Sequence, residues 1–124
     1  MVNKDVVRVS EILDINIRDL YQFSNNQAKH YYAASIPKKS GGVRELNVPS
    51  HYLKHIQRKI LDKMLYSLPV SAYAKAYFPK ARLTDNALPH MGKEKILKLD
   101  IKGFFDNIDV DMVCSVFSRL GFES

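Results

Sequence analysis

The sequence predicts an α+β fold built from helices, one short β-hairpin and one further strand. Apolar residues recur every three or four positions within residues 5–24 and 50–68, which is typical of amphipathic helices. Two strand-like runs flank Gly41-Gly42, and the apolar run 96–101 suits a short, mostly buried strand. The length of 124 residues favours a single domain.

The composition favours an anionic partner and excludes cysteine-based sites and a membrane-spanning helix. The formal net charge of +6 and the pI of about 9.4 favour an anionic partner. The single cysteine, Cys114, excludes an internal disulfide and a cysteine-rich zinc site, and its apolar helical setting predicts a small core residue. No apolar run reaches the roughly 18 residues that a membrane helix needs. Because the N-terminus also opens no signal peptide, we expect a cytoplasmic protein with no membrane contact.

Local signals set the expected element boundaries. Asn16 and Ser50 are of the type that caps helix N-termini, and the helix after Ser50 is expected to continue to about Leu68. Its apolar face is core, while Lys54 and Arg58 lie elsewhere on it. A basic helix face is usually solvated, and the alternative is a salt-dependent contact with a nucleic-acid backbone.

The predicted hairpin joins a strand at 30–36 to a return strand that begins at Val43. Gly41-Gly42 supplies the positive φ angles that a tight hairpin turn demands. Lys38, Lys39 and Arg44 gather cations on this tip and its arm. They suit a clamp on a triphosphate, with ammonium as a point charge and guanidinium as a bidentate fork, and the alternative is a solvated basic turn.

Asp100 stands near the end of the apolar run 96–101. A carboxylate at the end of a buried strand needs a compensating partner, because a lone buried charge is costly. A hydrated magnesium ion is one such partner. The alternative is an ordinary Asp that caps the following turn. Asp109 then caps a last helix, which Gly121 terminates.

Several stretches together resemble a known family. The letters Leu-Asp-Ile-Lys-x-Phe-Phe-x-x-Ile at 99–108 strongly resemble motif A of bacterial reverse transcriptases, in particular the retron and group II intron type. The letters Ile-Pro-Lys-Lys-x-Gly-Gly-x-Arg at 36–44 resemble the fingers hairpin of the same family, and residues 53–61 resemble the helix that follows it.

The resemblance implies roles for individual residues of motif A. Asp100 would be a ligand of the two catalytic metals, and Phe105 would lie under the sugar of the incoming nucleotide and reject a 2′-hydroxyl. The main chain from Ile101 through Gly103 and Phe104 would touch metal and triphosphate. Gly103 departs from the many relatives that carry a second Asp at this place. The implied cofactor is Mg²⁺, with Mn²⁺ as the alternative.

Outside motif A, the resemblance implies contacts with nucleotide and nucleic acid. Lys38 or Lys39, together with Arg44, would hold the triphosphate, and Lys54 and Arg58 would contact template or primer. In the segment 74–87 the implied nucleic-acid contacts are the side chains of Lys80, Arg82 and Asn86. This segment departs from its relatives at Ala76 and Lys80, where they carry glycine, and at Arg82, where they carry serine.

The resemblance also implies a division of the chain and a function. Residues 1–95 would form N-terminal helices and the fingers, and 96–124 the first strand and helix of a right-hand polymerase palm. The Tyr-x-Asp-Asp hairpin, the remaining palm and the thumb are missing. We therefore expect a fragment of an RNA-directed DNA polymerase, inactive alone, whose parent adds dNTPs to a DNA primer 3′-hydroxyl on an RNA template by two-metal nucleotidyl transfer. The alternative function is a non-catalytic nucleic-acid-binding module.

The predicted strand 96–101 would have an open edge, because its partner hairpin is missing. An apolar strand with an open edge invites pairing with another chain. We expect either self-association through this strand or an edge covered by the C-terminal helix.

Overall fold

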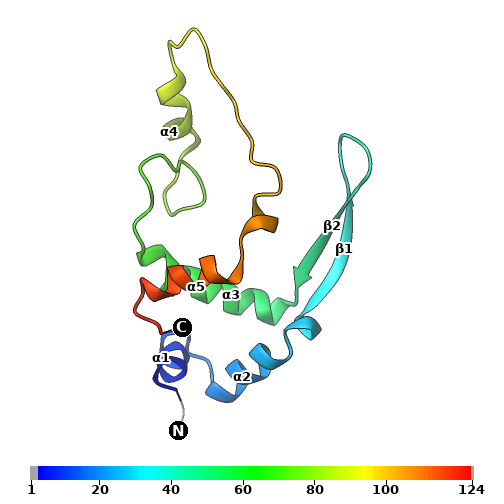
Figure 1. The fold of residues 1–124 in the computed structure, drawn as a ribbon, viewed down its shortest axis with the longest axis vertical. Coiled ribbons are helices and arrows are strands. Elements are labelled where there is room, and N and C mark those ends of the chain that lie inside the picture. Colours follow the sequence, from blue (N-terminus) through cyan, green and yellow to red (C-terminus); the bar gives the residue numbers. More distant parts are fainter. Residues whose placement is uncertain (1–2, 124) are drawn as a thin grey trace. The chain divides into compact units, whose positions relative to one another are not determined.

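A computed structural model describes residues 3–123, which divide near residue 65 into two compact units. The helices and the single antiparallel hairpin confirm the α+β class (Figure 1). The first unit contains α1 (Lys4–Leu13), α2 (Ile17–Asn25), η1 (Gln27–His30), β1 (Tyr31–Pro37), β2 (Val43–Pro49) and α3 (His51–Lys63). The helical segments from there onward are η2 (Leu65–Ser67), α4 (Leu83–Ala87), η3 (Leu88–His90), η4 (Phe105–Asn107) and α5 (Val110–Ser118).

The β-hairpin forms where the sequence predicts it. β1 and β2 pair in antiparallel register, with Ile36 opposite Arg44. The Lys38 N–H donates to the Gly42 carbonyl oxygen (3.0 Å), and the Gly41 N–H donates to the Lys38 carbonyl oxygen (3.1 Å). Both glycines have positive φ angles, 87° and 84°, which confirms the reason for expecting glycine in this turn.

The predicted helix starts are also confirmed. The side chains of Asn16, Ser50 and Asp109 each accept a hydrogen bond from a main-chain N–H in the first turn of the helix that follows. The predicted end of the helix after Ser50 is wrong, because α3 ends at Lys63 and not near Leu68. A separate 3₁₀ turn, η2, carries the apolar pattern onward, and Pro69 disfavours α-helical geometry in the residue before it.

The core of the first unit is small and joins α1 to α3. Leu13 is 1% exposed and Ile56 is 6% exposed. The Lys59 ammonium donates to the Leu13 carbonyl oxygen (2.8 Å) and to the Asp14 carbonyl oxygen (3.3 Å). A cation suits the C-terminal end of a helix, where carbonyl groups lack intrahelical partners. Lys59 therefore ties α3 to the end of α1.

Aromatic contacts and hydrogen bonds fix the base of the hairpin. The Phe23 ring stacks on Tyr52 of α3, with centroids 4.9 Å apart. The Ser50 N–H donates to the His30 carbonyl oxygen (2.6 Å). The Gln57 side-chain amide donates to the Tyr31 hydroxyl (2.9 Å). The base of the hairpin is thus attached to α3.

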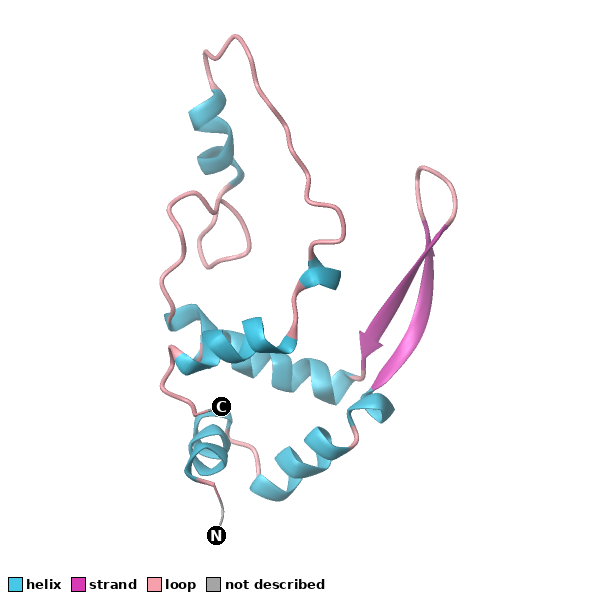
Figure 2. Ribbon diagram, viewed as in Figure 1, coloured by secondary structure: helices cyan, strands magenta, loops and turns pink. Residues whose placement is uncertain are grey.

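The prediction of a strand at 96–101 is wrong for this structure, which places these residues in a loop (Figure 2). The side chains of Leu97 and Leu99 are 82% and 81% exposed, so α5 does not cover this run. A strand needs a neighbour to pair its main-chain groups, and in residues 3–123 the only β pairing is between β1 and β2. The prediction of a buried Cys114 is also wrong, because its side chain is exposed on α5.

Membrane insertion through a helix finds no support in residues 3–123. None of the helices described there is both long enough and apolar enough to cross a bilayer.

Candidate functional site

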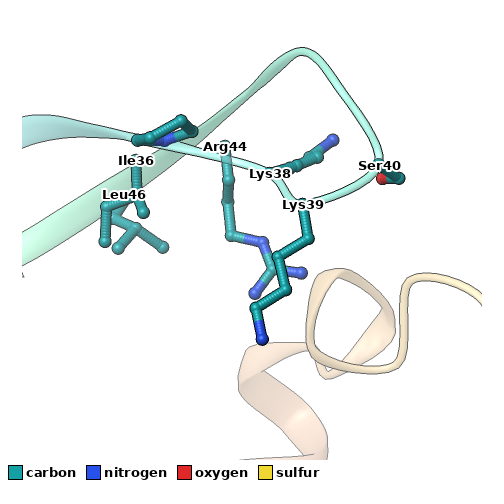
Figure 3. A pocket seen from close by; sticks show the side chains of 7 residues that line it. Ile36, Lys38, Lys39, Ser40, Arg44 and Leu46 are labelled. Carbon is teal, nitrogen blue, oxygen red and sulfur yellow. The ribbon is translucent and has the colours of Figure 1, made fainter.

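A hollow of about 440 Å³ lies at the tip of the hairpin (Figure 3). Two features share it: an apolar patch from the strands and a set of cations from the turn and β2. Its lining residues are Ile36, Pro37, Lys38, Lys39, Ser40, Arg44 and Leu46.

Strand geometry explains the apolar patch. Ile36 faces Arg44 across the ladder, and Leu46 lies two residues further along β2. Side chains alternate between the two faces of a strand, so these three residues share one face. One face of the hairpin therefore offers an apolar surface beside a guanidinium.

The two lysines point in different directions. The side chains of Lys39 and Arg44 run to the same side of the hairpin, whereas Lys38 extends away from them (Figure 3). The sequence left the choice between the lysines open, and Lys39 is the one whose side chain runs to the same side as that of Arg44 (Figure 3).

No carboxylate neutralises these cations within residues 3–123. Glu45 is the acidic residue of the hairpin, and it lies on the opposite face from Arg44 because the two are neighbours in a strand. Its carboxylate accepts a hydrogen bond from the Ser35 hydroxyl (2.7 Å) across the ladder. Neither lysine, nor Arg44, has an ion pair in the described part of the chain. The face that carries Arg44 is therefore suited to an anion.

Helix α3 presents the second predicted group of cations. Lys54 and Arg58 line an open hollow of about 460 Å³ on this helix, together with His51, His55, Gln57 and Leu61. Arg58 also pairs with Asp62 at 3.2 Å, but both side chains are largely exposed and such pairs are weak. His51 and His55 were not among the predicted site residues, although a spacing of four residues places two side chains on the same face of a helix.

The segment 74–87 contains two residues other than glycine in a left-handed backbone conformation. Lys80 has a φ of 66°, as does Tyr77. A left-handed conformation costs about 1–2 kcal/mol in a residue with a side chain. Arg82 pairs with Asp85 at 3.3 Å, and Asn86 lies exposed on α4. The three predicted contacts thus lie close in sequence, and Arg82 differs from Lys80 and Asn86 because its guanidinium is engaged by Asp85.

The motif A residues lie in an exposed stretch before α5. Asp100 is in a loop, and Phe104 and Phe105 meet edge to face with centroids 5.4 Å apart. Gly103 has a φ of 62°, and the Asn107 side-chain amide donates to its carbonyl oxygen (2.7 Å). Glycine adopts such a φ without the steric cost that a side chain brings.

The donors needed for a complete metal centre do not come together in residues 3–123. No group of three or more His, Cys, Asp or Glu side chains there could hold a metal ion. A divalent ion such as Mg²⁺ prefers about six oxygen ligands, so Asp100 and the Ile101 carbonyl could supply only part of such a set.

Comparison with known proteins agrees with the motifs. The family described as reverse transcriptase (RNA-dependent DNA polymerase) matches residues 36–124. The chain is 34% identical to the retron Mx65 reverse transcriptase of Myxococcus xanthus over 118 residues, which are 92% of this chain and 28% of that protein. It is 35% identical to the retron Mx162 reverse transcriptase of the same organism over 65% of this chain and 17% of that protein.

A third relative comes from another organism. The retron Ec83 reverse transcriptase of Escherichia coli is 32% identical over 74% of this chain and 30% of that protein. The chain thus spans less than a third of the length of each of these relatives. The matches confirm the resemblance to retron-type reverse transcriptases, and the chain therefore belongs to the reverse transcriptase family.

Proposed function

We propose that this chain holds the triphosphate of an incoming deoxynucleotide between Lys39 and Arg44, as the nucleotide-binding front of an RNA-directed DNA polymerase. The observation that carries the proposal is the pair of cations on one side of the hairpin tip, without a neutralising carboxylate in the described residues. A guanidinium fork matches two phosphate oxygens, and an ammonium adds a movable point charge. Lys38 would then remain in solvent.

The proposed role of motif A follows from family membership. Asp100 and the Ile101 carbonyl would be ligands of Mg²⁺ or Mn²⁺, and the metal when bound would neutralise charge on the phosphates. The main chain at Gly103 and Phe104 would lie along the triphosphate, and the Phe105 ring would lie under the sugar. In that position the ring of Phe105 would clash with a 2′-hydroxyl, which would favour deoxynucleotides.

The wider proposal concerns the enzyme to which these residues belong. It would extend a DNA primer 3′-hydroxyl on an RNA template in the cytoplasm, with Lys54, Arg58, Lys80, Arg82 and Asn86 along the nucleic acid. We assign residues 1–95 to its fingers and N-terminal helices and 96–124 to the start of its palm. These 124 residues hold no Asp-Asp pair, so we expect no polymerase activity from them alone.

A comparison of the two neighbouring lysines tests the proposed clamp. Lys39→Ala is expected to weaken binding of a deoxynucleoside triphosphate roughly fivefold to tenfold, because one charge-assisted contact is lost. Lys38→Ala removes the same charge from the adjacent residue and is expected to change the affinity less than twofold. Isothermal titration calorimetry measures both. A greater loss with Lys38→Ala than with Lys39→Ala would contradict the assignment.

A second candidate function is a nucleic-acid-binding module without catalysis. The basic hollow on α3 and the net charge of +6 favour it. It predicts nucleic-acid binding that weakens with salt and with Lys54→Ala, with no response to Asp100→Ala or to triphosphate. The nucleotide clamp is preferred because the hairpin hollow combines cations with an apolar patch.

We also propose self-association through the exposed apolar run 96–101, which would gain main-chain pairing and burial against a second copy. Leu97→Asp is expected to shift the chain to monomer in sedimentation equilibrium, while Lys98→Ala leaves the distribution unchanged. A wild-type chain that stays monomeric at about 100 μM, a concentration at which weak edge pairing should be visible, excludes this proposal.

A further inference from the structure

Two of the four histidines of the chain lie one turn apart on α3. His51 begins this helix, and His55 follows four residues later. Residues at this spacing lie on the same face of a helix, with Cβ atoms about 5–6 Å apart. Both side chains line the open hollow of about 460 Å³ on α3, so the two imidazole rings border the same space.

Neither of these rings is used by the fold of residues 3–123. Both side chains are exposed, and neither imidazole takes part in a hydrogen bond, an ion pair or a ring contact within that part of the chain. His30 differs, because its ring lies against Phe23 with centroids 4.4 Å apart. His90 has no second histidine within four positions in the sequence. The pair on α3 therefore brings together two imidazoles whose position is not explained by packing.

Two neutral imidazoles at this spacing form a chelate for a divalent transition-metal ion. A bond from zinc to a histidine nitrogen is about 2.0–2.1 Å long, so two rings whose Cβ atoms are about 5–6 Å apart can converge on one ion. Two histidines four residues apart on a helix supply the same pair of zinc ligands in metalloproteases. Imidazole suits Zn²⁺, Ni²⁺ and Cu²⁺, whereas Mg²⁺ prefers oxygen ligands. The pair therefore selects transition metals against magnesium.

Two positive charges oppose a cation at this place. The ammonium of Lys54 is on the residue next to His55, and the N-terminal end of a helix carries a partial positive charge. Arg58 opposes it less, because its guanidinium is paired with Asp62 at 3.2 Å. The hollow is open to solvent, so water and salt screen these charges. The repulsion therefore lowers the affinity for a metal without removing the bonds to nitrogen.

We infer that His51 and His55 bind one divalent transition-metal ion of the class of Zn²⁺, Ni²⁺ and Cu²⁺, with water in its remaining coordination positions. Within residues 3–123 no third His, Cys, Asp or Glu side chain joins them, so the expected dissociation constant is on the order of 10–100 μM, weaker than that of a four-ligand structural site. The ion would tie the first turn of α3 to the second. The inference goes beyond the proposed function and does not depend on it.

The test is a calorimetric titration of the 124-residue chain, prepared without a polyhistidine tag, with NiCl₂ in the presence of excess Mg²⁺. All proteins carry Cys114→Ser, because an exposed thiol also binds these metals. His51→Ala and His55→Ala are each expected to weaken binding about tenfold or more, because a single imidazole remains where two formed a chelate. His90→Ala removes a histidine elsewhere and is the matched control, with an unchanged affinity.

Lys54→Ala gives a second readout with the opposite sign. Removing the ammonium beside His55 is expected to strengthen Ni²⁺ binding about twofold to threefold, and added salt is expected to reduce this gain, because the repulsion is screened. The same variant is expected to weaken nucleic-acid binding, so a loss of folding could not produce both results. Circular dichroism shows whether each variant keeps the helical content of the wild type.

Three results would overturn the inference: no saturable Ni²⁺ binding up to about 1 mM, displacement of Ni²⁺ by the excess Mg²⁺, or wild-type affinity in the double variant His51→Ala/His55→Ala. Lys39→Ala, which tests the triphosphate clamp, is expected to bind Ni²⁺ like the wild type. A failure of the clamp and a failure of the metal site are therefore distinguishable, because each is read from its own variants and its own ligand.

Discussion

Arg44→Ala is expected to weaken binding of a deoxynucleoside triphosphate roughly 10- to 100-fold, the largest functional effect of any single change in this chain. The reason is the geometry of the guanidinium, which can donate two parallel hydrogen bonds to phosphate oxygens. Because Glu45 lies on the other face of the hairpin, Arg44 forms no ion pair with a carboxylate of residues 3–123 that a phosphate would have to displace. Isothermal titration calorimetry with a deoxynucleoside triphosphate measures the loss.

Two controls separate this contact from a general charge effect. Arg18→Ala removes the same charge from α2 and is expected to leave the affinity unchanged. Arg44→Lys keeps the charge but loses the fork, so its affinity is expected to lie between those of the wild type and Arg44→Ala. Equal losses in Arg18→Ala and Arg44→Ala would show that the hairpin has no specific site.

Leu13→Ala is expected to lower the free energy of unfolding of the first unit by about 3 kcal/mol, within the range of about 2–5 kcal/mol for such truncations. Leu13 is the largest fully buried side chain among the described residues, and it lies where α1 meets α3. Small domains have a total stability of about 5–15 kcal/mol, so this one truncation removes a large share. Urea unfolding followed by circular dichroism gives the value.

Val7→Ala is the matched control on the same helix. Val7 is 36% exposed, against 1% for Leu13, so its truncation removes less buried surface, and alanine is the better helix former. Its unfolding midpoint is expected to equal or slightly exceed that of the wild type. If both variants unfold at the same urea concentration, the contact between α1 and α3 does not stabilise the unit in solution.

Signals that act within a few residues made much of the first unit predictable. Gly41 and Gly42 identify the hairpin turn because few other residues adopt positive φ without cost, and Asn16 and Ser50 identify helix starts because their side chains reach the first free N–H groups. The α+β class and the reverse transcriptase family follow from these signals together with the motif letters.

The errors concern contacts between distant parts of the chain. The apolar run 96–101 has the composition of a strand, but pairing depends on a neighbour that composition does not reveal. Cys114 fits an apolar helical pattern, yet α5 leaves it exposed. The sequence shows Lys59 only as one of several cations on a helix. Its contact with the end of α1 joins residues that are 45 or 46 positions apart, and the sequence does not predict it. The proposed choice of Lys39 over Lys38 likewise rests on side-chain directions within the turn, which the letters of the sequence do not reveal.

The hairpin is joined to α3 at its base, so a small rotation about the base would displace the tip by a larger distance. Each strand has seven residues, and a strand rises about 3.3 Å per residue. The cations of the tip therefore lie roughly 20 Å from the base, where Gln57 donates to Tyr31. A rotation of about 5° about the base would displace the tip by about 2 Å. That displacement is enough to break a hydrogen bond whose ideal length is about 3 Å. In the proposed clamp, residues at the base of the hairpin would therefore help to set the position of the cations that hold the triphosphate.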